Sequence, residues 1–339
     1  MGIGVNTLNR SKRSTESVHR SRSAAAPGPV PSPVDLRRML RDHLSRRAWD
    51  ALERTARGRR AALKARGAAA LWAKGVRRAV AEALDLGDLA ARPLKIRRVS
   101  RFEQPHLTIE NVLFESLDGW SVNGSVFVPR DPLYAPPYPA VVVPCGHSTK
   151  TGPNYQGVCQ VLARAGWIAI TFDPPGQGTE KDPGNDHFRD APRGYAVGWN
   201  AQRFFVADAL RAIDYLSTRP DVDRRPGFAL TGVSGGGHTT MWAALMDRRI
   251  RLAAPVCCAT RLSAHPVRDG YAGCAEGFSI GRCRAGLDDV DLMAALAPIP
   301  QLFMAGARDE VMTAAMSREL ADDVARAYGV AGVPEAFEF

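Results

Sequence analysis

A single serine stands between glycines in the stretch Gly232-Val233-Ser234-Gly235-Gly236. The apolar residues 228–230 before it predict a buried strand, and apolar residues at helical spacing follow it from Met241 to Leu245. In so tight a strand-to-helix turn, glycines leave room for the chain to approach itself two residues before and after the serine. The pattern favours nucleophilic attack by the Ser234 hydroxyl, with the Gly235 N–H placed to bind a developing oxyanion.

The elements around this turn alternate between strand and helix. The spacing predicts an α/β fold with a mostly parallel central sheet and helices on both faces. Two antiparallel strands, joined at Asp118-Gly119, are expected before the parallel part. Expected strands are 107–115, 120–128, 138–144, 167–172, 228–230, 250–256, 299–304 and 335–339, and expected helices are 155–165, 201–218 and 313–328. Residues 257–297 read as a long irregular excursion of the kind that shapes a substrate pocket.

The N-terminal part differs in composition. Residues 1–33 are rich in Ser, Arg, Ala and Pro and are expected to be disordered. Residues 34–93 are expected to form a helical extension that packs on a catalytic domain at 94–339. Asp35 could cap its first helix, and a second helix is expected from about 59 to 84, anchored by Trp72. The apolar stripe expected on the first helix consists of Leu36, Met39, Leu40, Leu44, Ala48 and Leu52.

The formal net charge of +10 is unevenly distributed. Residues 1–100 hold 23 Lys and Arg against 8 Asp and Glu, whereas the remainder holds 22 against 27. The positive charge is therefore concentrated in the N-terminal part. We expect it to form a solvated, arginine-rich helical face, and phosphate binding is the alternative function. A nucleic-acid partner is not expected. No apolar run is long enough to span a membrane, although a membrane-surface role for the basic helices is a further alternative.

The six cysteines show neither a C-x-x-C pair nor metal-ligand spacing, so no metal and no cofactor are predicted. Buried free thiols in a cytoplasmic protein explain them best, since the N-terminus also lacks the apolar segment of a signal peptide. A disulfide between Cys274 and Cys283 is the alternative for that pair. The sequence does not indicate an oligomeric state.

Four stretches carry a resemblance to a known family. From about residue 107 onwards, the chain resembles the acetyl-xylan-esterase and dienelactone-hydrolase-like branch of the α/β-hydrolase superfamily. The resemblance implies a serine carboxylic-ester hydrolase that acts through an acyl-enzyme on small acyl esters, with acetylated carbohydrate as one candidate. The stretches are Pro144-Cys145-Gly146-His147-Ser148 with Lys150, Phe172-Asp173-Pro174-Pro175-Gly176-Gln177-Gly178, the serine turn, and Leu296-Ala297-Pro298-Ile299-Pro300 leading to Gly306 and Asp309.

The resemblance also assigns roles by position. Ser234 would be the nucleophile and Asp309 the triad acid, although a surface acid in a turn is the alternative for Asp309. Gly146 and His147 would supply the second oxyanion donor beside Gly235. Asp173 is expected to be a turn-forming residue that binds local N–H groups.

The triad histidine of such families follows the last strand, and this chain has none beyond His265. A C-terminally shortened chain of low activity is the resulting expectation. His147 is the best substitute, because it lies in the oxyanion turn, close enough to touch substrate. His238 lies one helical turn beyond Ser234, where its backbone direction disfavours a proton-accepting geometry, and His187 and His265 lie on loops. Two further hypotheses remain open, which are a peptidase of the same fold and a non-catalytic protein that binds a ligand.

Overall fold

The computed structural model describes residues 36–130, 132–176, 193–261 and 280–339. The chain forms two compact units, residues 1–42 and 43–339, and helix α1 (Leu36–Ala62) crosses from one to the other. The sheet and all other described elements belong to the second unit. Five predictions lie outside the described residues: disorder over 1–33, the Asp35 cap, a loop around His187, a loop around His265, and a disulfide that would need Cys274.

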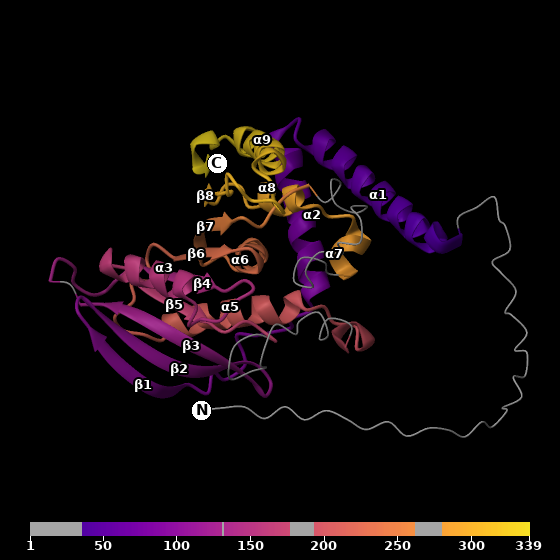
Figure 1. Ribbon diagram of the computed structural model, residues 1–339. Coiled ribbons are helices and arrows are strands. Elements are labelled where there is room, and N and C mark those ends of the chain that lie inside the picture. Colours follow the sequence, from indigo (N-terminus) through magenta and orange to yellow (C-terminus); the bar gives the residue numbers. More distant parts are fainter. Residues whose placement is uncertain (1–35, 131, 177–192, 262–279) are drawn as a thin grey trace, which may run out of the picture. The chain divides into compact units, whose positions relative to one another are not determined.

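In the described residues, nine strands form one sheet in the order β1-β2-β3-β5-β4-β6-β7-β8-β9. Figure 1 shows this order from β1 at the bottom towards β8 near the top. The first pairings, from β1 to β5, are antiparallel, and those from β5 to β9 are parallel. The bounds are β1 Arg97–Gln104, β2 Leu107–Leu117, β3 Trp120–Pro129, β4 Ala140–Pro144, β5 Ile168–Phe172, β6 Phe228–Val233, β7 Ile250–Val256, β8 Gln301–Leu302 and β9 Phe337–Glu338. The predicted α/β class with a mostly parallel sheet is confirmed.

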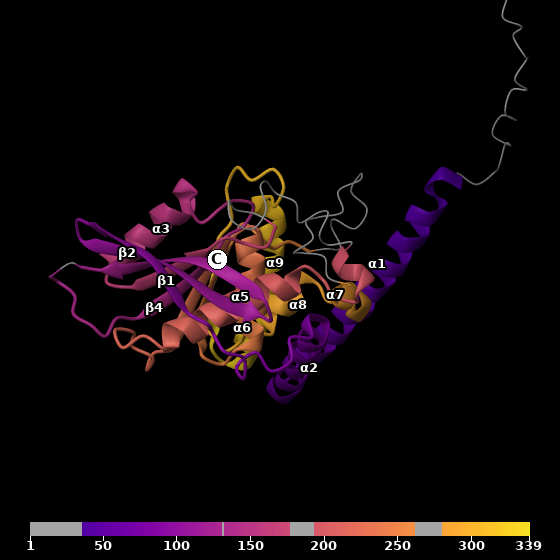
Figure 2. The ribbon, with the colours of Figure 1, turned by 90° about the horizontal axis from the view of Figure 1, so that it is seen from below.

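Helices cover both faces of this sheet. Successive side chains of β4 point to opposite faces of the sheet. Val141 and Val143 pack with α3 residues such as Cys159 on one face, and Val142 packs in the larger core on the other. Helix α3 therefore lies opposite α5 and α6, as Figure 2 shows. The bounds are α3 Pro153–Arg164, α5 Gln202–Ser217, α6 Gly235–Met246, α7 Ile280–Ala285, α8 Asp289–Ala294 and α9 Ala314–Ala331, with a 3-10 turn at Pro334–Ala336.

The helices before the sheet differ from the expected pattern. Helix α1 continues to Ala62, and α2 begins only at Arg66, so the break falls later than predicted. The stripe expected to pack is exposed at Leu44 (55%) and becomes buried at Leu52. Helix α2 (Arg66–Leu84) buries Val76, Val80 and Leu84 and contacts α6, α7, α8 and α9, with Trp72 partly buried against the core.

Arginines from these helices are hydrogen-bonded inside the unit. Arg59 is 5% exposed and donates to the Asp291 carboxylate at 2.5 Å. Arg77 donates to the carbonyl oxygens of Leu245 at 3.1 Å and Ala295 at 2.9 Å, which lie at the C-terminal ends of α6 and α8. Helix ends leave such carbonyls without intrahelical donors, so Arg77 caps two helices from a third. Burial lowers the pKa of Arg77, with Arg248 as a smaller cause.

Some elements were missed or misjudged from the sequence. Strand β1 has no apolar alternation because it is an edge strand with both faces largely exposed. The excursion after β7 contains α7 and α8, and α8 begins at a capping box between Asp288 and Asp291. Strand β8 has only two residues. No helix in the described ranges has the length and hydropathy required to cross a membrane.

Candidate active site

Ser234 occupies the bend between β6 and α6. Its backbone has φ 58° and ψ −120°, a conformation that is costly for a residue with a side chain. The Ser234 N–H donates to the Val256 carbonyl at 2.9 Å, which fixes the bend against β7. Strain of this kind persists only when the surrounding structure enforces it, so the fold holds Ser234 half-buried at the carboxyl edge of the sheet.

The flanking glycines are required by close backbone contacts. A Cβ on Gly232 would lie 2.6 Å from the Gly236 carbonyl carbon and 2.8 Å from the Pro144 oxygen. A Cβ on Gly236 would overlap the Pro144 carbonyl oxygen and lie 3.0 Å from its carbon. Backbone atoms cannot move aside as side chains can. The predicted close approach two residues before and after the serine is confirmed.

The turn after β4 lies against this bend. A Cβ on Gly146 would lie 3.2 Å from the Gly235 nitrogen and 2.6 Å from the Val233 oxygen. Gly235 opens α6, so its N–H is one of the first-turn donors without an acceptor inside the helix. His147 follows Gly146 and is exposed. The structure therefore brings the three predicted oxyanion-site residues to one place, beside Ser234.

The Gly146 amide, however, already has an acceptor. Its N–H donates to the Tyr155 hydroxyl at 2.6 Å, and that hydroxyl in turn donates to the Val233 carbonyl at 3.5 Å. The prediction that Gly146 supplies an oxyanion donor is corrected accordingly, because its amide fastens the turn to the elbow strand. Burial raises the pKa of Tyr155 to about 12, so the hydroxyl stays protonated. Apart from a tyrosine early in α3, no sequence pattern indicates this contact.

Replacing Tyr155 by phenylalanine is expected to lower the free energy of unfolding by about 1–3 kcal/mol, because it leaves the buried Gly146 N–H without an acceptor. Urea unfolding followed by tryptophan fluorescence measures the change. Tyr134, which is 40% exposed, provides the matched control, and Tyr134→Phe is expected to stay within about 0.5 kcal/mol of wild type. Equal effects of the two variants would contradict the assigned role.

Asp309 lies in the loop after β8. Its Oδ1 accepts the N–H groups of Val311 at 2.9 Å and Met312 at 2.8 Å, so the carboxylate shapes its own loop. Because β6, β7 and β8 are neighbours, this loop begins about 10 Å from Ser234 along the sheet edge, two strand spacings away. Both residues predicted for the triad thus follow parallel strands at the same edge.

Cys257 lies between them and was not singled out from the sequence. It follows β7 with φ 46°, and its N–H donates to the Met304 carbonyl at 2.8 Å. Burial raises the pKa of its thiol, and the Asp309 charge and a hydrogen bond with Asp309 act in the same direction. The neutral thiol therefore adjoins the carboxylate. Cys145, Cys159, Cys257 and Cys258 are free thiols, as predicted.

Two other predicted residues have structural partners. The His238 Nε2 faces the Cys258 carbonyl, in keeping with the prediction that His238 does not accept the Ser234 proton. Asp173 has a partner beyond the local N–H groups expected of it. It is 1% exposed and accepts the N–H of Lys150, 23 residues earlier, at 2.8 Å. Such a contact across two strand ends leaves no local sequence signal.

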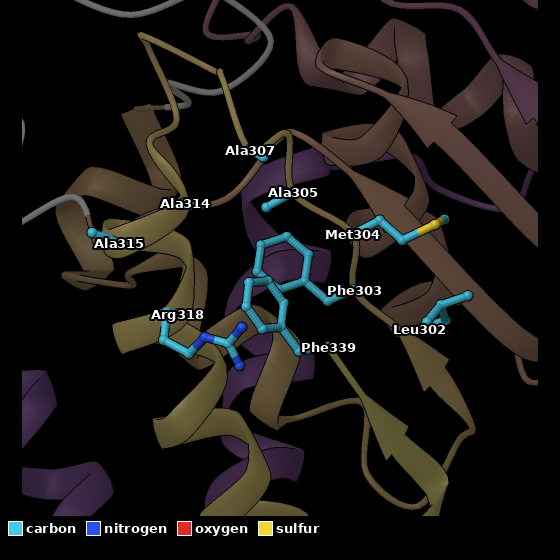
Figure 3. A pocket seen from close by; sticks show the side chains of 9 residues that line it. All are labelled: Leu302, Phe303, Met304, Ala305, Ala307, Ala314, Ala315, Arg318 and Phe339. Carbon is cyan, nitrogen blue, oxygen red and sulfur yellow. The ribbon is translucent and has the colours of Figure 1, made fainter.

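An open groove of about 550 Å³ lies between α9 and β8, next to the Asp309 loop (Figure 3). The Phe303 and Phe339 ring centroids are 5.1 Å apart, and the Arg318 guanidinium stands 4.5 Å from the Phe339 ring centroid. Its lining is apolar apart from Arg318 and does not include Ser234. The lining residues are Leu302, Phe303, Met304, Ala305, Ala307, Ala314, Ala315, Arg318 and Phe339.

Comparison with known proteins finds similarity in three-dimensional structure. No protein-family model matches the chain, and no curated protein matches it in sequence. A candidate acetyl xylan esterase from Bacteroides fragilis NCTC 9343 superposes with a TM-score of 0.67 at 18% identity, over 81% of this chain and 75% of that one. A methylesterase superposes with a TM-score of 0.64 at 24% identity, over 81% of this chain and 59% of that one.

A glucuronoyl esterase from Solibacter usitatus superposes with a TM-score of 0.55 at 17% identity, over 75% of this chain and 80% of that one. At such identities a likeness establishes the fold, and the sheet order and the serine bend described above agree with it. The chain has the α/β-hydrolase fold, in the form shared with these esterases.

Proposed function

We propose that this protein is a serine carboxylic-ester hydrolase that acts through an acyl-enzyme on small acyl esters. The observation that carries the proposal is the conformation of Ser234, held at φ 58° and ψ −120° at the entrance to α6. In support of the proposal, Ser234 directly precedes Gly235, whose N–H opens α6 at the positive end of the helix dipole. A merely structural serine would gain nothing from such strain.

The proposed reaction has two half-reactions. Ser234 Oγ attacks the ester carbonyl carbon and loses its proton to a base, and the carbonyl oxygen becomes an oxyanion bound by the Gly235 N–H. The bond to the alcohol oxygen then breaks, and the alcohol leaves with that proton. Water attacks the acyl-enzyme in the same way and releases the carboxylic acid. Asp309 is the proposed triad acid, and His147, the substitute predicted for the triad histidine, is the proposed base.

Small acyl groups on carbohydrate are the proposed substrate class. The structures with similar folds bear the names of an acetyl xylan esterase, a methylesterase and a glucuronoyl esterase, all of them ester hydrolases. A panel of acetylated sugars, methyl esters and aminoacyl amides would separate this class from a peptidase of the same fold. Turnover of the amides in preference to the esters would favour the peptidase.

A fluorophosphonate probe tests the proposal directly, because it reacts only with an activated serine in an oxyanion site. The expected result is a single adduct, located on Ser234 by peptide mapping and absent in Ser234→Ala. The experiment is run with and without added imidazole. An adduct formed only with imidazole would support the nucleophile and oxyanion site and show that the base is not in place. No adduct in either arm would reject the hydrolase and favour a non-catalytic binding protein.

A further inference from the structure

A buried polar cluster lies beside the proposed oxyanion site, where β5 ends between β3 and β4. Asp173 follows β5, and its Oδ1 accepts the Lys150 N–H at 2.8 Å while its Oδ2 accepts from Asn123 Nδ2 at 2.8 Å. The Asp173 N–H also donates to the Asn123 carbonyl at 3.1 Å. One carboxylate thus joins β3 to the turn that follows β4.

This turn, residues 145–150, is fastened at both ends. Near its start, Gly146 is bound by the Tyr155 hydroxyl and lies against Gly235. At its end, Lys150 is bound through its backbone by Asp173. Between these two anchors, His147 is the predicted oxyanion donor of this turn, and Gly146 next to it lies against the Ser234 bend. An oxyanion donor is effective only when its position is fixed before the reaction, so the second anchor sets the geometry of this side of the site.

The cluster also contains two buried charged residues, and burying a charge is costly unless it has partners. Asp173 is 1% exposed and Lys150 is 6% exposed. The Lys150 Nζ donates to Ser125 Oγ at 3.3 Å. Both charges act on the buried Cys145 thiol, whose pKa burial raises to about 12; Asp173 raises it further, whereas Lys150 lowers it. Both residues therefore lie near Cys145, at the end of β4.

We infer that Asp173 is a positioning residue that holds the turn at residues 145–150 in its oxyanion-binding geometry. The inference rests on the proposed ester hydrolysis and adds a residue outside the predicted triad. Asp173 acts through the Lys150 backbone, and the Lys150 ammonium, which donates to Ser125, is the buried opposite charge nearby. The turn therefore requires a hydrogen-bond acceptor at position 173. A negative charge at that position is needed only while Lys150 supplies a buried positive charge.

Two variants separate these requirements. Asp173→Ala removes the acceptor, and kcat for p-nitrophenyl acetate is expected to fall by about 10- to 100-fold with KM within about threefold of wild type. Asp173→Asn combined with Lys150→Met keeps an acceptor oxygen and removes both charges, and its kcat is expected to return to within about threefold of wild type. The rate of fluorophosphonate labelling is expected to follow kcat in both proteins, and near-UV circular dichroism checks that each is folded.

The outcomes are distinguishable from failure of the proposed function. If wild type neither turns over the ester nor labels at Ser234, the hydrolase proposal fails. If wild type is active, a folded Asp173→Ala protein with unchanged kcat would overturn the positioning role. Should that variant not fold, the double variant decides alone, since a folded double variant with kcat lowered more than tenfold would overturn the role as well.

Discussion

The Ser234→Ala protein is expected to hydrolyse p-nitrophenyl acetate with a kcat/KM at least about a thousandfold below that of wild type. The substitution removes the oxygen that forms the acyl-enzyme and leaves only the binding groups and the Gly235 N–H. Because Ser234 is half-buried at a bend fixed through its N–H to Val256, loss of Oγ should leave the fold intact. Initial rates corrected for spontaneous hydrolysis measure the effect.

Ser121 provides the matched control, because it is an exposed serine on β3. Ser121→Ala is expected to keep kcat/KM within about twofold of wild type, as substitutions at exposed sites usually have small effects. Activity that persists in Ser234→Ala at the level of the control would remove Ser234 from the mechanism. Unchanged urea unfolding of both variants would show that the loss is chemical.

The Gly236→Ala protein is expected to lose both stability and activity. Considered as a helix residue alone, alanine would stabilise α6 by about 1 kcal/mol relative to glycine. The added methyl group would nevertheless overlap the Pro144 carbonyl oxygen and lie 3.2 Å from the Cys145 carbonyl carbon. The overlap is with backbone at the end of β4, so the free energy of unfolding is expected to fall by about 1–3 kcal/mol.

Relief of that overlap must move β4 or α6, and both carry groups of the proposed oxyanion site. A displacement of about 1 Å there is expected to lower kcat about a hundredfold. Gly75, within α2, is the matched control, since nothing lies within 4 Å of its added Cβ. Gly75→Ala is expected to raise the free energy of unfolding by about 1 kcal/mol without changing kcat. Similar behaviour of the two alanine variants would refute the steric account of the elbow.

The sequence was most informative where local pattern and function coincide. Glycines at 232 and 236, an apolar strand before them and a helix after them predicted the bend correctly, since each requirement is local. The parallel strands were predicted because buried strands are continuously apolar, as residues 140–144 are. Strand β1 was not predicted from the sequence, because an exposed edge strand needs no apolar residues.

The contacts that shape the site could not be read from the sequence. Tyr155 binds Gly146 across a loop and the first turn of α3, and Asp173 binds Lys150 across two neighbouring strand ends. The second depends on which strands become neighbours, and the order β3-β5-β4-β6 departs from the chain order. Each residue has an ordinary local explanation, a core tyrosine or a turn aspartate, which periodicity alone cannot separate from its actual role.

The arginines that cap α6 and α8 and pair with Asp291 also bear on the electrostatic potential of the protein. The guanidinium groups of Arg59 and Arg77 donate hydrogen bonds inside the protein, and the Asp291 carboxylate is the counterion of Arg59. A tally of basic residues thus overstates the positive potential that an approaching polyanion would meet over this part of the molecule. These arginines connect helices within the folded unit. The abundance of arginine therefore reflects structural roles as well as the capacity to bind anions.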